Sequence, residues 1–548
     1  MKITYILGVC IVGVVLVSIF TSCATSKKST NEGTETLSLP PPECPPAAEY
    51  PAIAMANLLF EPGNSTMPSA TLYYPGGEEY ADIAERPFVS AKEQPLSTFS
   101  LHPDSAAYAN IRRFLEQGQW PPSDAVRIEE LVNYFSYDYP QPQGKHPFSI
   151  NVEVGACPWA GEHLLARIGL KGRDLPKGER PPANLVFLID TSGSMSASNR
   201  LPLVKESLKA LLEILEPEDR VALVTYAGTS NVALESTPVE QRVTIRDAIE
   251  VLGAGGSTHG SAGIQDAYAM AEKHFIKQGI NRVLLATDGD FNVGVTSHEG
   301  LLALIEEKRE TGVFLTVLGY GMGNLKDDAL EMLASKGNGN YAYINDYSEA
   351  RRVLVEQVSG TLATIAKDAK IQVEFNPARV SEYRLLGYEN RMLAAKDFND
   401  DTKDAGEIGA GHTVTALYQI VPKGVSIGPG VDPLRYQQED KEEKVLPTPE
   451  NADELMFVKL RYKQPDGADS SLIEIPVSSD TADAENVSSD FRFAAAVAGF
   501  GLLLRDSPHK GTATFDSIRE LATSAVDSDH YRETFLNLIV TAKTIRQP

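Results

Sequence analysis

Five oxygen-bearing side chains in three separate segments could together hold a metal ion. Asp190, Ser192 and Ser194 follow one apolar run, Thr258 lies in a glycine-rich stretch, and Asp288 follows a second apolar run. Carboxylate and hydroxyl oxygens are typical ligands of a small hard dication, which also keeps several waters. Two carboxylates crowded in one place repel each other, and a cation between them relieves the repulsion. The residue types therefore predict a divalent metal site, provided that the fold brings the segments together.

The predicted secondary structure around these segments indicates that they come together at one edge of a sheet. Residues 183–366 alternate between continuous apolar runs, such as NLVFLID and NRVLLATDG, and amphipathic stretches, such as LVKESLKALLEIL. This pattern predicts a doubly wound α/β domain with a mostly parallel sheet covered on both faces. Ligands of such sheets bind at the carboxyl ends of the strands, where Asp190 and Asp288 stand. Alternatively, Ser192 and Ser194 only cap a helix, but capping explains neither Thr258 nor Asp288.

The flanking segments have other periodicities. Residues 96–180 open with two amphipathic helices, the first with Asp104 as N-cap and with Tyr108, Ile111 and Leu115 on one face, and end in two alternating strands at 148–170. Residues 367–487 return to period two and predict a β-rich, sandwich-like domain, and 488–548 are helical. The strands of the β-rich domain at 367–487 are expected to pair with those at 148–170, which would make the α/β domain an insertion in a β-sandwich.

The apolar run FAAAVAGFGLLL, at 493–504, is too short for a membrane span and predicts a buried helix.

The N-terminus is typical of an exported lipoprotein. Lys2, an apolar run of about 15 residues and Ser22-Cys23 predict a signal peptide at 1–22 and a lipid on Cys23. The alternative is an uncleaved anchor. Residues 23–95, rich in Pro, Ser, Thr and Glu, are expected to be a flexible tether. Cys44 and Cys157 would remain in the exported chain, either paired or as two thiols.

Charge and missing motifs narrow the function classes. The 548 residues carry 74 acidic and 50 basic side chains, a net charge of −24, and so acidic a chain repels nucleic acid. The sequence has no GxxxxGK[ST] motif for a nucleotide, no GxSxG and no HExxH. We therefore expect no nucleic acid and no nucleotide as partner.

The five residues together resemble a known type of metal site. LIDTSGSM, Thr258 and the TDG at 287–289 resemble the metal-ion-dependent adhesion site (MIDAS) of von Willebrand factor type A (VWA) domains. The resemblance implies that Ser192 and Ser194 bind the metal directly, that Thr258 binds it directly or through water, and that Asp190 and Asp288 act through water. It implies Mg²⁺, or Mn²⁺ or Ca²⁺, with one coordination position open to an Asp or Glu of a partner.

The flanks extend the resemblance to about 95–545. Segments before and after the α/β domain resemble a bacterial family of exported VWA lipoproteins with a VWA-associated N-terminal region and a YfbK-type C-terminal domain. In VWA domains, coordination by the Thr258-type ligand is coupled to movement of the last helix, here residues 348–366. The alternative is a rigid module that simply docks.

The expected protein is a lipid-anchored interaction module of the bacterial cell envelope and not an enzyme. Its expected partners are an envelope protein that presents an Asp or Glu to the metal, and the membrane, through lipidated Cys23. Residue 25 is Thr and not Asp, so nothing in the sequence indicates retention at the inner membrane, and we expect the outer membrane. The alternatives are a metal-dependent hydrolase with Asp190 or Asp288 as base, and a structural envelope protein with a non-functional metal site.

Overall fold

The computed structural model describes most of the chain from residue 71 onward. The described residues are 71–73, 77–176, 178–256, 260–289, 298–425, 453–465, 467–478, 487–526 and 529–546. The predicted signal peptide at 1–22, Cys23, Cys44 and Thr258 lie outside them.

A six-stranded sheet forms the centre of the α/β domain, and its strand order is β12-β11-β10-β7-β8-β9. Five strands are parallel, and β9 pairs with β8 in the antiparallel sense. β7 is buried along its whole length and β10 from Asn281 onward, because helices cover both faces of the sheet. The strands are β7 (Ala183–Asp190), β8 (Arg220–Tyr226), β9 (Ser230–Pro238), β10 (Ile280–Thr287), β11 (Phe314–Tyr320) and β12 (Tyr341–Ile344).

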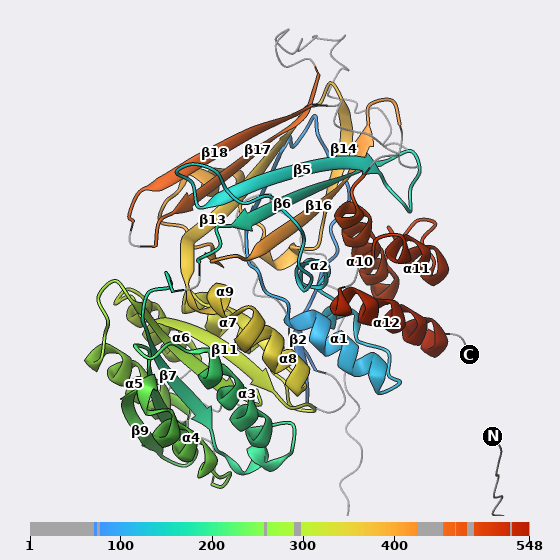
Figure 1. Ribbon diagram of the computed structural model, residues 1–548. Coiled ribbons are helices and arrows are strands. Elements are labelled where there is room, and N and C mark those ends of the chain that lie inside the picture. The colour runs from blue at the N-terminus through green and yellow to red at the C-terminus, as the bar shows by residue number, and fades with distance from the viewer. Residues whose placement is uncertain are drawn as a thin grey trace, which may run out of the picture. The chain divides into compact units, whose positions relative to one another are not determined.

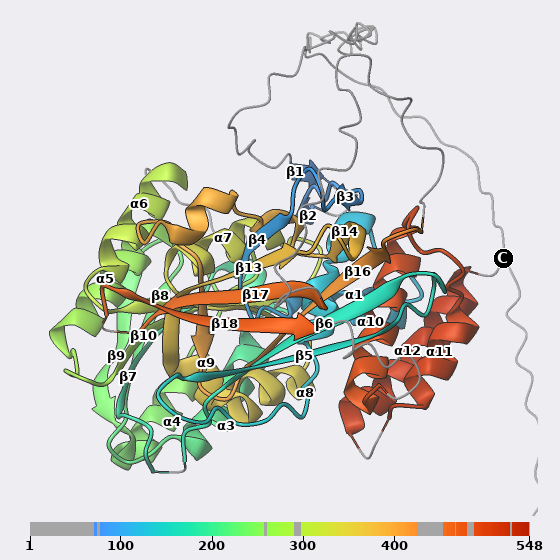
Figure 2. The same cartoon turned by 90° about the horizontal axis from the view of Figure 1, so that it is seen from above.

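Helices pack on both sides of this sheet. Figure 2 shows α5 and α6 on one side and α3 and α4 on the other. Two separate cores result, one under α3, α4 and α8, and one under α5, α6 and α7. The helices are α3 (Leu201–Ile214), α4 (Arg242–Glu250), α5 (Gly260–Lys273), α6 (His298–Arg309), α7 (Asp327–Lys336), α8 (Tyr347–Arg351) and α9 (Val358–Leu362).

Two further sheets enclose the core of a β-sandwich (Figure 1). The expected pairing is confirmed: β5 pairs with β6, and β6 pairs with β16, so the α/β domain is inserted between strands of one sandwich. One sheet holds β3 (Val89–Ser90), β5 (Phe148–Ala156), β6 (Leu164–Gly172), β14 (Val380–Leu386) and β16 (Thr413–Pro422); the other holds β4 (Leu96–Ser100), β13 (Thr364–Phe375), β15 (Gly406–Gly409), β17 (Glu454–Lys463) and β18 (Ser470–Ser478).

Helices from the two ends of the chain form a shared core. Figure 1 shows α1, in blue, beside the red helices α10 and α12, and their apolar side chains belong to one cluster. The predicted face of Tyr108, Ile111 and Leu115 is buried in it, and the run at 493–504 lies inside the buried helix α10, as predicted. The helices are α1 (Ala106–Glu116), α2 (Ile128–Asn133), α10 (Ser489–Arg505), α11 (Phe515–Thr523) and α12 (His530–Arg546). None of the helices in the described part of the chain has the length and hydropathy of a bilayer span.

The expected tether is wrong at its C-terminal end. β1 (Thr71–Tyr73) pairs with β2 (Glu79–Ala81), and the Tyr80 side chain is 0% exposed. The peptide N–H of Glu79 donates to the carbonyl of Leu325, 2.8 Å away, which ties β2 to the α/β domain. A strand of two or three residues is too short to show the alternation of apolar and polar residues by which strands are recognised, and the surrounding segment is rich in proline.

Three other details differ from the prediction. Asp104 does not cap α1, because its carboxylate accepts from the Tyr341 N–H at 3.1 Å and from Arg391 at 3.0 Å. No element was predicted for 230–250, where β9 and α4 lie. The last helix of the α/β domain is broken by a π-helical turn (Arg352–Glu356) and ends at Leu362, because Thr364 already begins β13.

Buried ion pairs hold this broken helix against α1 and α2. Glu349 accepts from Tyr134 at 2.9 Å, from Arg112 at 3.2 Å and from Arg352 at 2.8 Å. Arg352 also donates to Ser105 at 2.9 Å and stacks on the Tyr134 ring at 3.9 Å. The guanidinium groups of Arg352 and Arg112 help to hold the pKa of the Glu349 carboxyl below its usual value, against the effect of burial. Movement of the last helix remains a prediction, and it would have to break or carry along these contacts.

We expect Glu349→Ala to lower the free energy of unfolding by about 3–5 kcal/mol, because it leaves the buried Arg352 guanidinium without its carboxylate and leaves Arg112 with only that of the partly exposed Asp346. Urea unfolding followed by circular dichroism measures this loss. Glu213→Ala is the matched control: it removes the partner of Arg246 in an exposed pair and should cost about 1 kcal/mol or less. Equal losses in the two variants would contradict a clamping role for Glu349.

Candidate metal centre

The strand-end residues Asp190 and Asp288 lie at the same edge of the central sheet. β7 and β10 are parallel neighbours, with Ile189 opposite Ala286, so the residues that follow them emerge side by side. The Thr287 hydroxyl lies 3.5 Å from Asp190 Oδ2. Both carboxylate side chains are buried, and Asp190 is 0% exposed. The structure thus brings together two of the three segments predicted from the sequence.

The turn after β7 arranges the two serines. The Ser192 N–H donates to Asp190 Oδ1 at 2.8 Å, which holds the carboxylate against its own turn. The next residues form a 3₁₀ turn, Gly193–Ser196, in which the hydroxyls of Ser192 and Ser194 lie 2.9 Å apart. Ser192 is buried and Ser194 is exposed, so the pair of hydroxyls connects the buried carboxylate with the surface.

The part of the glycine-rich loop that the structure describes, up to Gly256, lies at this edge, and Thr258 lies outside the described residues. The Gly255 N–H donates to the Thr191 carbonyl at 2.7 Å, and the Gly193 N–H donates to the Gly256 carbonyl at 3.1 Å. Gly256, two residues before Thr258, has a φ of 95°, which favours glycine. The described part of the loop is therefore fastened to the same turn that carries the serines.

Burial, opposed by hydrogen bonds from Ser192 and reinforced by the negative charge of Asp288, raises the pKa of Asp190 to about 6. A buried carboxylate next to a second one is costly unless positive charge compensates it. The electrostatics of this edge therefore favour a cation.

Arg200 supplies one positive charge to this site, and its role there was not predicted from the sequence. Its Nη1 lies 2.7 Å from Asp288 Oδ2 and donates to the Ser194 carbonyl at 2.8 Å, and its Nη2 donates to the Met322 carbonyl at 2.9 Å. Gly321 has a φ of 81°, and a Cβ there would lie 2.5 Å from Arg200 Nε. No sequence signal near residue 200 indicates this pairing, because both Asp288 and Gly321 are distant in the chain.

The donor set consists of oxygen atoms. Among the described residues, no three His, Cys, Asp or Glu side chains gather as a metal-binding group. The set at this edge has two carboxylates instead, and hydroxyls supply its other oxygens. Such a set fits a hard dication such as Mg²⁺, Mn²⁺ or Ca²⁺ better than a metal that prefers sulfur or imidazole.

Comparison with known proteins identifies the parts of the chain. A family model described as von Willebrand factor type A domain matches residues 184–357, one described as von Willebrand factor matches 75–167, and one described as Uncharacterized protein YfbK, C-terminal, matches 360–545. The Uncharacterized protein YfbK of Escherichia coli (strain K12) is 43% identical over 474 residues, which are 85% of this chain and 81% of that protein. The chain belongs to the YfbK family. This membership confirms the predicted family and, with the VWA match, the predicted fold class.

More distant relatives of this YfbK-family chain share only part of it. Human inter-alpha-trypsin inhibitor heavy chain H4 is 26% identical over 235 residues, which are 41% of this chain and 25% of that protein. Among solved structures, von Willebrand factor type A from Catenulispora acidiphila aligns with a TM-score of 0.41 and 15% identity, over 75% of this chain and 92% of that one.

Gly289 fixes the turn that presents Asp288, and a substitution there tests this. Its φ is 98°, and a Cβ would lie 2.8 Å from backbone atoms of Asn324 and Lys326. We expect Gly289→Ala to cost about 1–3 kcal/mol of stability, measured as a lower urea midpoint. Gly253→Ala is the control, because a Cβ at Gly253 meets open space and its φ is outside the left-handed region. A Gly289→Ala variant as stable as Gly253→Ala would show that the turn can relax.

Proposed function

We propose that this YfbK-family protein is a metal-dependent interaction module of the cell envelope. Asp190, Ser192, Ser194 and Asp288, joined by Thr258, would hold a divalent cation, Mg²⁺ or else Mn²⁺ or Ca²⁺. The observation that carries the proposal is the meeting of two buried carboxylates and a pair of hydroxyls 2.9 Å apart at one strand edge. Hydroxyl and carboxylate oxygens gathered in one place are the ligands that a hard cation prefers.

The serines and the aspartates would contribute differently to metal binding. Ser192 and Ser194 offer uncharged oxygens, and the buried carboxylates of Asp190 and Asp288 offer negative charge from behind, so little of that charge reaches the surface. A bound dication would supply an electrophilic position for the carboxylate of a partner's Asp or Glu. Exposed Ser194 lies at the surface where that partner would approach, and exclusion of water by the surrounding contacts would strengthen the bond.

The anchoring proposal rests on the sequence alone. Lys2, the apolar run and Ser22-Cys23 support export and lipidation at Cys23, and with them attachment to the outer membrane. The partner would then be another envelope protein with an acidic group. The chain is not proposed to have enzymatic activity.

One observation favours hydrolysis as a second candidate. The pKa of Asp190 is raised to about 6, mainly by burial, and raised pKa values also occur in general bases. However, a general base must reach the proton that it removes, and the Asp190 carboxyl group is 0% exposed. Turnover of carboxylate or phosphate esters in Mg²⁺ or Mn²⁺, abolished by Asp190→Asn, would favour the hydrolase instead.

The metal site is tested by Ser194→Ala. We expect this variant to lose at least about tenfold in Mg²⁺ affinity, because it removes one directly binding oxygen. Isothermal titration calorimetry measures the affinity, and EDTA-treated protein provides the baseline. Ser196→Ala is the matched control, since Ser196 is exposed in the same 3₁₀ turn. Equal Mg²⁺ affinities of the two variants and the unaltered chain would contradict the assignment of Ser194.

Arg200 should oppose cation binding, because it already neutralises Asp288 at 2.7 Å. We expect Arg200→Gln to bind Mg²⁺ about tenfold more tightly, since removal of a nearby positive charge leaves the carboxylate to the cation. Arg246→Gln removes a positive charge from the exposed surface of the same domain and controls for net charge. An unchanged or weaker Mg²⁺ affinity in Arg200→Gln would show that Arg200 supports the site rather than competes for it.

A further inference from the structure

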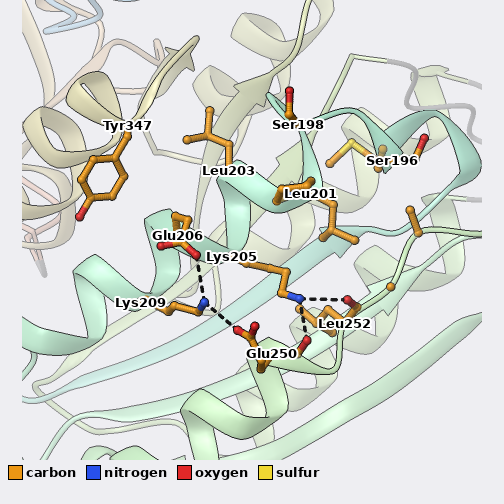
Figure 3. A pocket seen from close by; sticks show the side chains of 14 residues that line it. Ser196, Ser198, Leu201, Leu203, Lys205, Glu206, Lys209, Glu250, Leu252 and Tyr347 are labelled. Carbon is orange, nitrogen blue, oxygen red and sulfur yellow. Dashed lines mark hydrogen bonds and ion pairs between the residues drawn. The ribbon is translucent and has the colours of Figure 1, made fainter.

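A groove of about 680 Å³ begins at the turn that carries the serines. It runs between the first turns of α3 and the loop that follows α4, and Tyr347 of α8 lies at its far side (Figure 3). Met195 and Ser196, which belong to the same 3₁₀ turn as Ser194, line its near end. The groove and the candidate metal centre are therefore parts of one continuous surface.

The charged residues of the groove are already paired. Lys205 Nζ donates to the carbonyl of Glu250 at 2.6 Å and to that of Leu252 at 3.4 Å. Lys209 Nζ lies 3.0 Å from a Glu206 carboxylate oxygen and 2.6 Å from one of Glu250 (Figure 3). The two lysines and the two glutamates of the lining balance each other in charge, so the groove favours an uncharged group.

The remaining lining is mostly apolar. The apolar residues that line the groove are Met195, Leu201, Pro202, Leu203, Leu252, Ala254 and Tyr347, of which Met195, Leu201 and Leu203 are buried. Tyr347 is 46% exposed, and Val251, directly before Leu252, is 81% exposed. Met322, whose carbonyl accepts from Arg200, is 43% exposed. Large exposed apolar side chains around one edge of so acidic a protein are typical of a surface that excludes water on binding.

We propose that this groove is a second binding site for the partner, and that it receives one uncharged apolar side chain, such as Leu, Ile, Met or Phe. That side chain stands on the same partner segment as the Asp or Glu that approaches Ser194. This inference rests on the proposed function, and it adds the partner's chemistry: an acidic residue followed or preceded at short distance by an apolar one. The acidic residue alone could engage many proteins, and the apolar one supplies selectivity.

A bulky residue at Gly253 tests the groove without harming the fold. Gly253 lines the groove, a Cβ there meets open space, and its φ is outside the left-handed region. Gly253→Trp should therefore fill the groove. Gly161→Trp is the matched control, because Gly161 is an exposed glycine in the β5–β6 turn with equally open space. Mg²⁺ titration of both variants verifies that the metal centre is unchanged.

The probe is a library of phage-displayed random peptides, selected on the full chain in Mg²⁺ and then synthesised. We expect selected peptides to share an acidic residue and an apolar residue at a constant offset. Their binding should vanish in EDTA and fall at least tenfold in Gly253→Trp but not in Gly161→Trp. Replacement of the apolar residue by Ala in the peptide should cost as much as Gly253→Trp does, and less in that variant than in the unaltered chain.

The other outcomes separate the two proposals. EDTA-sensitive peptides that bind Gly253→Trp as they bind the unaltered chain would overturn the groove and leave the metal-dependent function standing. Peptides that are insensitive to EDTA but lose affinity in Gly253→Trp would overturn the metal bridge and support the groove as an apolar site. If no selected peptide is sensitive to either change, both proposals fail.

Discussion

The repulsion between Asp190 and Asp288 is the constraint on which this part of the protein depends. The parallel pairing of β7 and β10 forces their carboxyl ends to the same edge, and helices on both faces keep water away. A buried pair of like charges must be compensated. Arg200 compensates Asp288, and the N–H of Ser192 holds Asp190. Gly289 and Gly321 allow the close approach that this arrangement needs, because neither position leaves room for a Cβ.

The β-sandwich is attached at the opposite edge of the central sheet. At the amino end of β10, Arg282 donates to the Leu362 carbonyl at 3.3 Å and to the Thr364 hydroxyl at 3.2 Å, where the chain returns to the sandwich. The sandwich is thus connected at the end of the sheet away from Asp190. Near the candidate metal centre, Glu78 accepts from the Gly323 N–H at 2.8 Å. Residues that precede the sandwich therefore reach the loop whose Met322 carbonyl binds Arg200.

The ion pairs around Glu349 connect the same domain to the helices at both ends of the chain. Buried ion pairs contribute little net stability, but they are specific, because a displaced partner leaves an uncompensated charge. Tyr531 of α12 donates to Glu356 in the π-helical turn at 2.7 Å, so this turn has contacts outside the α/β domain as well. A movement of the broken helix would therefore act on the helices at both ends of the chain through these contacts.

Much of the fold could be predicted from the sequence, since local pattern and burial coincide there. The apolar runs before Asp190 and Asp288 predicted parallel strands, and period two at 148–170 and after 366 predicted strands that pair across the insertion, as β6 and β16 do. The N-terminal strands could not be predicted, because a two-residue strand such as Val89–Ser90 has no period of its own. The break in the last helix has no local signal either, and it lies beside Arg352, which contacts Glu349 and Ser105.

For the candidate site, the order of residues along the chain is enough to predict oxygen ligands after two strands, at Asp190, Ser192, Ser194 and Asp288. The pairing of Arg200 with Asp288 and the groove that begins at the same turn are visible only once the chain is folded. The physical reason is that strand periodicity is a short-range property of the chain. Pairing of charges and the shape of a surface depend on which distant segments come into contact when the core closes.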